Sequence, residues 1–136
     1  MRSVKLVLLL GVVVGGCSSD GLGPRTIIGN WVQDFTVPGS FMEMNLMSTG
    51  STVSGTGDWC AEAGPCGTLT VAGTINGIAV HLDLTFTPTF PPQFTQSSED
   101  HFDGQLTSFT ALKGSITAVI PGQPPGPVYP TGFHRG

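Results

Sequence analysis

The stretch Thr68–Phe86, TLTVAGTINGIAVHLDLTF, decides the fold class because apolar and polar residues alternate on both sides of a two-residue turn. In its second half every other residue is apolar. Strict alternation is typical of a strand with one buried face, and Asn76-Gly77 is a dipeptide that favours a tight hairpin. We therefore predict that Thr68–Ile75 and Ile78–Phe86 are strands that pair antiparallel.

The same alternating pattern recurs along the chain, in short runs separated by Gly, Pro, Asn or Ser. It predicts strands at Ile27–Val37, Phe41–Ser48, Thr52–Trp59, His101–Phe109 and Leu112–Ile120, with a weaker candidate at Phe90–Gln96. Seven or eight consecutive hairpin-linked strands favour an all-β, antiparallel up-and-down meander. A meander of this length removes its edges by closing into a small barrel. A two-sheet β-sandwich is the alternative.

Glycine recurs on the apolar face of several predicted strands, at Gly55, Gly73, Gly104 and Gly114. An inward-facing glycine lets a strand bend sharply and lets opposite walls approach each other. We therefore expect a narrow barrel with little internal space.

The first seventeen residues predict export. Arg2 and Lys5 precede an apolar run, Leu6–Val14, which is too short to span a bilayer as a helix. The sequence Val14-Gly15-Gly16-Cys17 resembles the lipobox of bacterial lipoproteins, in which the cysteine is lipidated and becomes the mature N-terminus. The resemblance implies a lipid anchor at Cys17 and, because serine follows it, the outer membrane of a two-membrane cell, facing the periplasm or the cell surface. An ordinary cleaved signal or a membrane anchor is the alternative.

These predictions divide the chain into four segments. Residues 1–16 are a signal peptide, 17–26 a lipidated cysteine with a flexible tether, 27–120 the β-barrel domain and 121–136 a Pro/Gly-rich tail. Proline and glycine disfavour a central strand, so we expect the tail to be a strap along the barrel wall or a partly disordered end. The alternative is an extended polyproline segment that offers Tyr129 and Phe133 to a partner.

Charge and motif content exclude several functions. Without Arg2 and Lys5 the mature chain has three cationic residues against nine acidic ones, a net charge of about −6. Because so few cations cannot form a basic stripe, we expect no binding to nucleic acid or to anionic lipid. The sequence has no Gly-x-Ser-x-Gly elbow and no phosphate-binding glycine loop. We therefore expect that the chain is not an enzyme and has no cofactor.

Two cysteines remain once Cys17 is assigned to the anchor. Cys60 and Cys66 lie in a turn-rich segment of a chain that is predicted to enter an oxidising compartment. We expect a disulfide between them, which stabilises the fold by about 2 kcal/mol for so short a ring. A metal site that uses both thiolates with a histidine is the alternative, although the spacing is unusual for zinc.

Two polar clusters could carry chemistry. His81 and Asp83 lie two residues apart on the polar face of one predicted strand, so their side chains point the same way. The second cluster lies where a loop enters a strand, and its weak candidates for a cation site are Glu99, Asp100, His101 and Asp103. A solvated outer surface is the alternative for both clusters.

Gly29-Asn30-Trp31, at the head of the first predicted strand, resembles the Gly-x-Trp that begins lipocalins, avidin-like proteins and other calycin barrels. In those families the tryptophan plugs one end of the barrel, which implies that Trp31 is a core plug and not a binding residue. The resemblance covers Ile27–Ile120. The chain is shorter than true lipocalins, and it lacks the several tryptophans of avidin-like proteins.

We therefore expect a non-enzymatic, lipid-anchored β-barrel of the cell envelope that binds a partner protein or a small apolar ligand. One form of this function is inhibition of extracytoplasmic hydrolases, because small one-disulfide inhibitor barrels have a similar opening Gly-x-Trp. The alternative is a metal-assisted envelope enzyme that uses the acidic and histidine cluster Glu99–Asp103.

Overall fold

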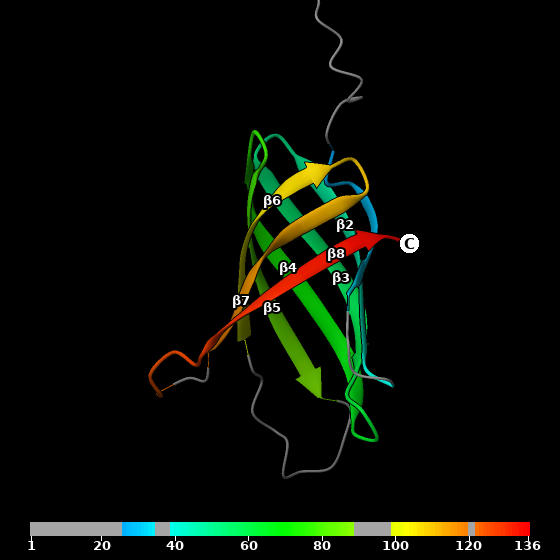
Figure 1. The fold of residues 1–136 in the computed structure, drawn as a ribbon, viewed down its shortest axis with the longest axis vertical. Coiled ribbons are helices and arrows are strands. Elements are labelled where there is room, and N and C mark those ends of the chain that lie inside the picture. Colours follow the sequence, from blue (N-terminus) through cyan, green and yellow to red (C-terminus); the bar gives the residue numbers. More distant parts are fainter. Residues whose placement is uncertain (1–25, 35–38, 89–98, 120–121) are drawn as a thin grey trace, which may run out of the picture.

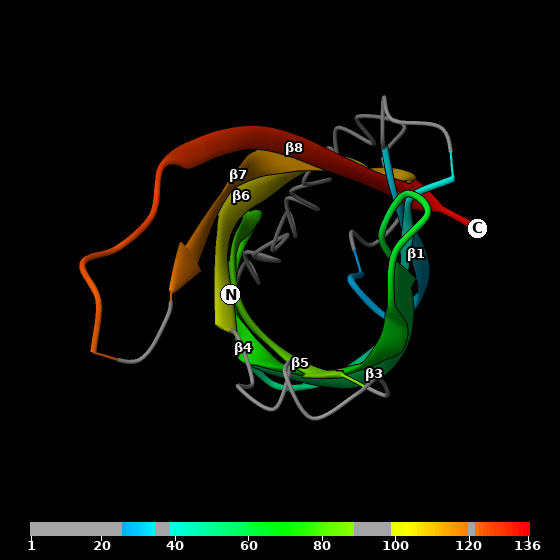
Figure 2. The same ribbon diagram turned by 90° about the horizontal axis from the view of Figure 1, so that it is seen from below.

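The computed structural model describes residues 26–34, 39–88, 99–119 and 122–136, which form one closed sheet (Figure 1). Its eight strands are β1 (Gly29–Gln33), β2 (Phe41–Thr49), β3 (Thr52–Cys60), β4 (Cys66–Asn76), β5 (Ala79–Pro88), β6 (Glu99–Ser108), β7 (Ala111–Val119) and β8 (Val128–Arg135). Consecutive strands pair antiparallel, and β8 returns to pair with β1, so the strands form a ring (Figure 2). The predicted up-and-down barrel is confirmed, and closure of the ring excludes the β-sandwich.

The hairpin between β4 and β5 has the predicted turn. Ile75 and Val80 are partners in the antiparallel register, and Gly77 adopts a φ of 61° in the turn between them. A positive φ is available to glycine at little steric cost, which is why Asn-Gly favours this kind of turn. The alternation on either side then places the large apolar residues of both strands on the inner face of the barrel.

The C-terminal segment differs from the prediction, because Val128–Arg135 is a strand of the barrel and not a tail outside it. Among the described residues, β8 pairs with β7 over 128–134 but with β1 only at Phe133–Arg135. Pro130 therefore lies where β8 has a single neighbour, and such an edge tolerates a residue without a backbone N–H. The barrel thus extends to Arg135, beyond the predicted boundary at residue 120.

Several predictions fall on residues outside the described ranges. These are the signal peptide, the lipobox with Cys17, most of the tether and the weak strand candidate Phe90–Gln96. Within the described ranges there is no helix with the length and apolar character needed to cross a membrane.

Inward-facing side chains fill the middle of the barrel and the end that contains Trp31, which we call the Trp end. Among the described residues, sixteen buried apolar side chains form this core: Ile27, Trp31, Met42, Met44, Leu46, Val53, Leu69, Val71, Val80, Leu82, Leu84, Phe86, Phe102, Leu106, Leu112 and Phe133. All of them lie between positions 27 and 133, so a chain of residues 18–136 contains every core residue that the structure describes. We use this chain below wherever detergent would interfere with a measurement.

Trp31 and Arg135 close the Trp end. Trp31 is fully buried, and its Nε1 donates a hydrogen bond of 2.7 Å to the carbonyl oxygen of Ile27. The guanidinium of Arg135 lies 4.9 Å from the centre of the Trp31 ring, a cation–π arrangement. It also donates to the carbonyl oxygens of Thr26, Ile28 and Phe109. One cation therefore joins the first described residues, the β6–β7 turn and the last strand.

Two predicted inward glycines bring β6 and β7 together. Gly104 and Gly114 are direct partners in the register of these strands. A Cβ added at Gly114 would collide with the carbonyl oxygen of Asp103, and one at Gly104 would lie 2.6 Å from the carbonyl oxygen of Lys113. Because no side chain larger than hydrogen fits at either position, these two glycines allow the close approach of β6 and β7.

Candidate ligand-binding site

The end of the barrel opposite Trp31 contains a cavity of about 370 Å³, which we call the mouth. Its inward-facing lining comes from six different strands and consists of Gln33, Met42, Trp59, Phe86, Asp100 and Ile116. Ser40, Phe41, Cys60 and Ala61 also border it. A volume of this size lies within the range of small-molecule sites. The expectation of little internal space is therefore wrong at this end of the barrel.

The polar lining of the mouth continues the inward rows of the core. Gln33 follows Trp31 by two residues, and Asp100 precedes Phe102 by two. Because side chains alternate along a strand, both point to the same side of the sheet as these buried aromatic residues. Gln33 was not predicted as a residue of the mouth, although its spacing of two residues from Trp31 was the available signal.

Two buried polar atoms at the mouth have no hydrogen-bond partner in the described part of the chain, Gln33 Oε1 and Trp59 Nε1. Gln33 is only 9% exposed, and its Nε2 already donates a hydrogen bond of 2.7 Å to Thr131 Oγ1. An unpaired buried polar group costs about 1–3 kcal/mol, so native structures rarely leave one without a reason. Both atoms belong to residues that line the mouth, so a ligand that displaces their immediate neighbours could satisfy one acceptor and one donor.

Asp100 adds an ionisable group to the mouth. Burial raises the pKa of this carboxyl to about 6, against an opposing effect of the nearby His101 charge. Desolvation has this effect because it disfavours the charged form of an acid. The carboxyl therefore changes its charge within a unit or so of neutral pH.

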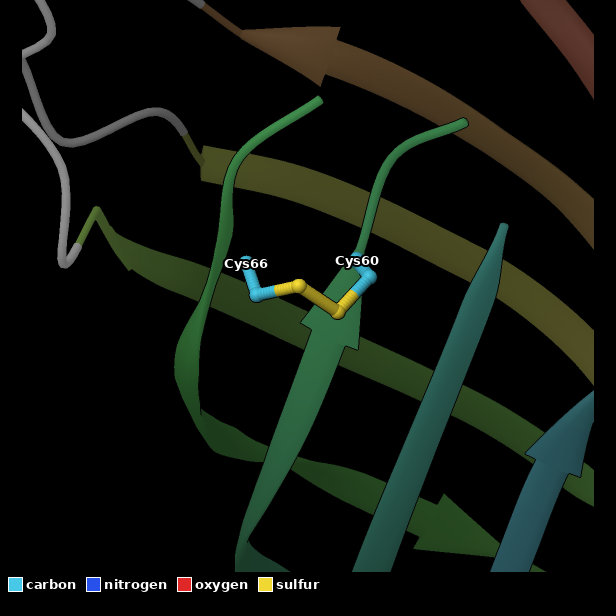
Figure 3. The surroundings of a disulfide bond; sticks show 2 residues. All are labelled: Cys60 and Cys66. Carbon is cyan, nitrogen blue, oxygen red and sulfur yellow. A yellow bond between two sulfur atoms is a disulfide. The ribbon is translucent and has the colours of Figure 1, made fainter. Parts of the chain in front are cut away.

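The predicted cysteine pair lies beside Trp59 at the rim of the mouth. Cys60 and Cys66 are partners at the ends of β3 and β4, with their Cα atoms 4.0 Å apart and their sulfur atoms at disulfide-bonding distance (Figure 3). The turn between them is further stabilised by a backbone hydrogen bond of 3.1 Å from the Ala61 N–H to the carbonyl oxygen of Pro65. This covalent link fixes the strand end that carries Trp59.

The two polar clusters of the sequence analysis meet on the outer face of β5 and β6. The register pairs His81 with Asp103 and Asp83 with His101. Asp100 is the exception among the predicted cation ligands, because it is the partner of Leu84 and borders the mouth. The alternation of the strand places it on the opposite side of the sheet from its neighbours in the sequence.

The fold and the mouth together define a class, an eight-stranded up-and-down β-barrel with a closed Trp end and a hollow opposite end. Comparison of the chain with protein-family models, with curated proteins and with solved structures found no match. The residues that line the mouth are therefore the basis for any functional conclusion.

Asp100→Asn is expected to stabilise the barrel near pH 7.5 and to have no effect below about pH 4. Since the folded pKa of Asp100 is about 6 and the reference value is 3.8, the native state holds the proton more tightly and loses stability as pH rises between these values. Two pKa units correspond to about 3 kcal/mol, and solvent access at the mouth reduces the expected gain to about 1–2 kcal/mol.

Urea unfolding of residues 18–136 in EDTA, followed by circular dichroism across this pH range, checks the prediction. Asp58→Asn, at an exposed position on β3, is the control and should change the stability by less than about 0.5 kcal/mol. A difference between Asp100→Asn and wild type that grows towards low pH would contradict the assignment.

Proposed function

We propose that the chain is a non-enzymatic, lipid-anchored β-barrel of the cell envelope that binds a small, largely apolar ligand in the mouth. The single observation that carries the proposal is that Gln33 Oε1 and Trp59 Nε1, which have no hydrogen-bond partner among the described residues, belong to two residues that line one largely apolar cavity. Small-molecule sites commonly combine apolar lining with a few polar groups that orient the ligand.

The lining defines the chemistry of the ligand. Met42, Phe86 and Ile116 offer an apolar surface to its body. The free acceptor at Gln33 and the free donor at Trp59 favour a ligand with a group that can both donate and accept a hydrogen bond, such as a hydroxyl or an amide. The Asp100 carboxyl disfavours an anionic head group.

The proposed anchor is compatible with an accessible mouth. Eight residues, 18–25, lie between Cys17 and Thr26, and the nine Cα–Cα steps reach about 30 Å when extended. Thr26 contacts Arg135 at the Trp end, so the tether joins the barrel at the end opposite the mouth. A lipid anchor at Cys17 then leaves the mouth free to face the aqueous phase.

Binding of N-phenyl-1-naphthylamine, a neutral aromatic probe with one N–H group, tests the proposal in residues 18–136. We expect its emission to rise on binding, and Ile116→Trp, which fills the mouth, to weaken the affinity about tenfold or more, or about 1.4 kcal/mol. The matched control is Ile78→Trp, at a 40% exposed position in the β4–β5 turn at the other end of the barrel. It should bind like wild type.

A competition experiment separates the polar groups from the apolar walls. 1-Octanol should displace the probe at a lower concentration than n-octane, because only the alcohol can pair with Gln33 and Trp59. Probe binding that survives Ile116→Trp unchanged, or its absence from the wild-type chain, would contradict a ligand site at the mouth. The second result would instead favour a partner protein, including a hydrolase, as the binding target.

A further inference from the structure

The outer face of β5 and β6 carries five titratable side chains that contact one another, His81 and Asp83 on β5 and Glu99, His101 and Asp103 on β6. His101 Nε2 lies 2.8 Å from Glu99 Oε1 and 3.6 Å from Asp83 Oδ1. One ligand atom from each of these three residues lies within 4.8 Å of the other two. We call this set the β5–β6 cluster.

We propose that Asp83, Glu99 and His101 bind a divalent transition-metal ion, with Zn²⁺ as the best fit to the ligand types. Zinc takes imidazole nitrogen and carboxylate oxygen at about 2.0–2.2 Å, so its tetrahedral ligands lie about 3.3 Å apart. The two distances from His101 Nε2 bracket that separation. An imidazole ligand favours a transition metal over Ca²⁺ or Mg²⁺, which prefer oxygen ligands alone.

His81 extends the site. Its Nε2 lies 3.1 Å from Asp83 Oδ1, and its Nδ1 lies 2.6 Å from Asp103 Oδ1. If Nδ1 carries the proton that is shared with Asp103, the lone pair of Nε2 points towards the Asp83 carboxylate. Metal-binding histidines commonly donate their second ring nitrogen to a carboxylate in this way. His81 lies outside the three-residue set whose ligand atoms are within 4.8 Å of one another, so it becomes a fourth ligand only if its side chain rotates towards the ion, with Asp103 as the group that orients it.

The charge of the cluster also favours a cation. Three carboxylates lie around two imidazoles, and in the part of the chain that the structure describes no Lys or Arg forms an ion pair with any of them. The side chains of Asp83 and His101 are 39% and 38% exposed, so an ion can enter and water can complete its coordination. The site lies on the outer wall, so it is independent of ligand binding in the mouth.

Calorimetric titration of the metal-free full chain with ZnCl₂, in a nonionic detergent, tests the inference. We expect one equivalent to bind, and His101→Ala and Asp83→Asn each to weaken the affinity about tenfold or more, as loss of a ligand requires. Asp103→Asn should have a smaller effect, because Asp103 acts through His81.

The chain provides a matched control in its third histidine. His134 lies on the outer face of β8, and its Nδ1 is 2.5 Å from Asp34 Oδ1, so it too is a half-exposed histidine paired with an aspartate. His134→Ala should bind Zn²⁺ like wild type, and so should the mouth variant Ile116→Trp. Circular dichroism confirms that each variant is folded.

Three results would overturn the inference. They are no saturable heat from the wild-type chain, an unchanged affinity in folded His101→Ala, and an equal loss in His134→Ala, which would mean unspecific binding to histidine. None of them depends on whether the mouth binds the naphthylamine probe, so this site and the proposed function fail or stand separately.

Discussion

Replacing Trp31 with alanine is expected to lower the free energy of unfolding by about 3–5 kcal/mol, the range for truncating a fully buried large aromatic residue. The change removes the ring beneath the Arg135 guanidinium and the hydrogen bond to the carbonyl oxygen of Ile27. The first contact joins the start of the barrel to its last strand, and the second fixes the segment that leads into β1. Urea unfolding of residues 18–136, followed by circular dichroism, measures the loss.

The second tryptophan provides the control. Trp31→Phe removes a buried indole N–H that donates a hydrogen bond and should cost about 2–3 kcal/mol. Trp59→Phe removes an N–H without a hydrogen-bond partner among the described residues, so it should change the stability by less than about 1 kcal/mol. An equal loss of stability in the two variants would contradict the difference between the two indole N–H groups, one hydrogen-bonded and one not.

Gly114→Val is expected to destabilise the barrel by roughly 3 kcal/mol or more, or to prevent folding, because the added side chain meets backbone atoms of β6. A flexible side chain could move aside, but the carbonyl of Asp103 and the chain at Gly104 are fixed in the sheet. The same urea unfolding assay applies, together with the yield of folded protein.

Lys113→Val is the matched substitution. Lys113 is exposed and adjacent to Gly114 on β7, so valine there adds the same side chain on the outer face, where β-branched residues suit a strand. It should change the stability by less than about 0.5 kcal/mol. If both valine variants had the same stability, the close approach of β6 and β7 at Gly104 and Gly114 would be refuted.

The barrel was predictable because the information that specifies it is local. Alternation in Ile78–Phe86 and the Asn76-Gly77 turn fix one hairpin, and repetition of this pattern leads to a closed meander. β8 was missed because its composition, with Pro130 and Gly132, argues against a strand that is paired on both sides. It is nevertheless a strand, because only its last three residues, Phe133–Arg135, pair with β1.

The sites were less predictable because each depends on partners from different strands. His81 and Asp83 could be placed on one face from spacing alone, but their proximity to His101 depends on the register between β5 and β6. Asp100 belongs to the mouth and not to this cluster, a distinction that requires the inward row of β6 to be known. The cavity itself follows from the volumes of side chains on six strands, which no single segment encodes.

The most direct test of ligand binding at the mouth is the indole region of a ¹H–¹⁵N correlation spectrum of residues 18–136, titrated with N-phenyl-1-naphthylamine. The chain has two tryptophans, so two indole N–H signals are expected. We predict that the Trp59 signal shifts on binding, while the Trp31 signal stays in place because its N–H is hydrogen-bonded to Ile27 at the far end. A probe that binds without moving the Trp59 signal, or that moves only the Trp31 signal, would contradict the account.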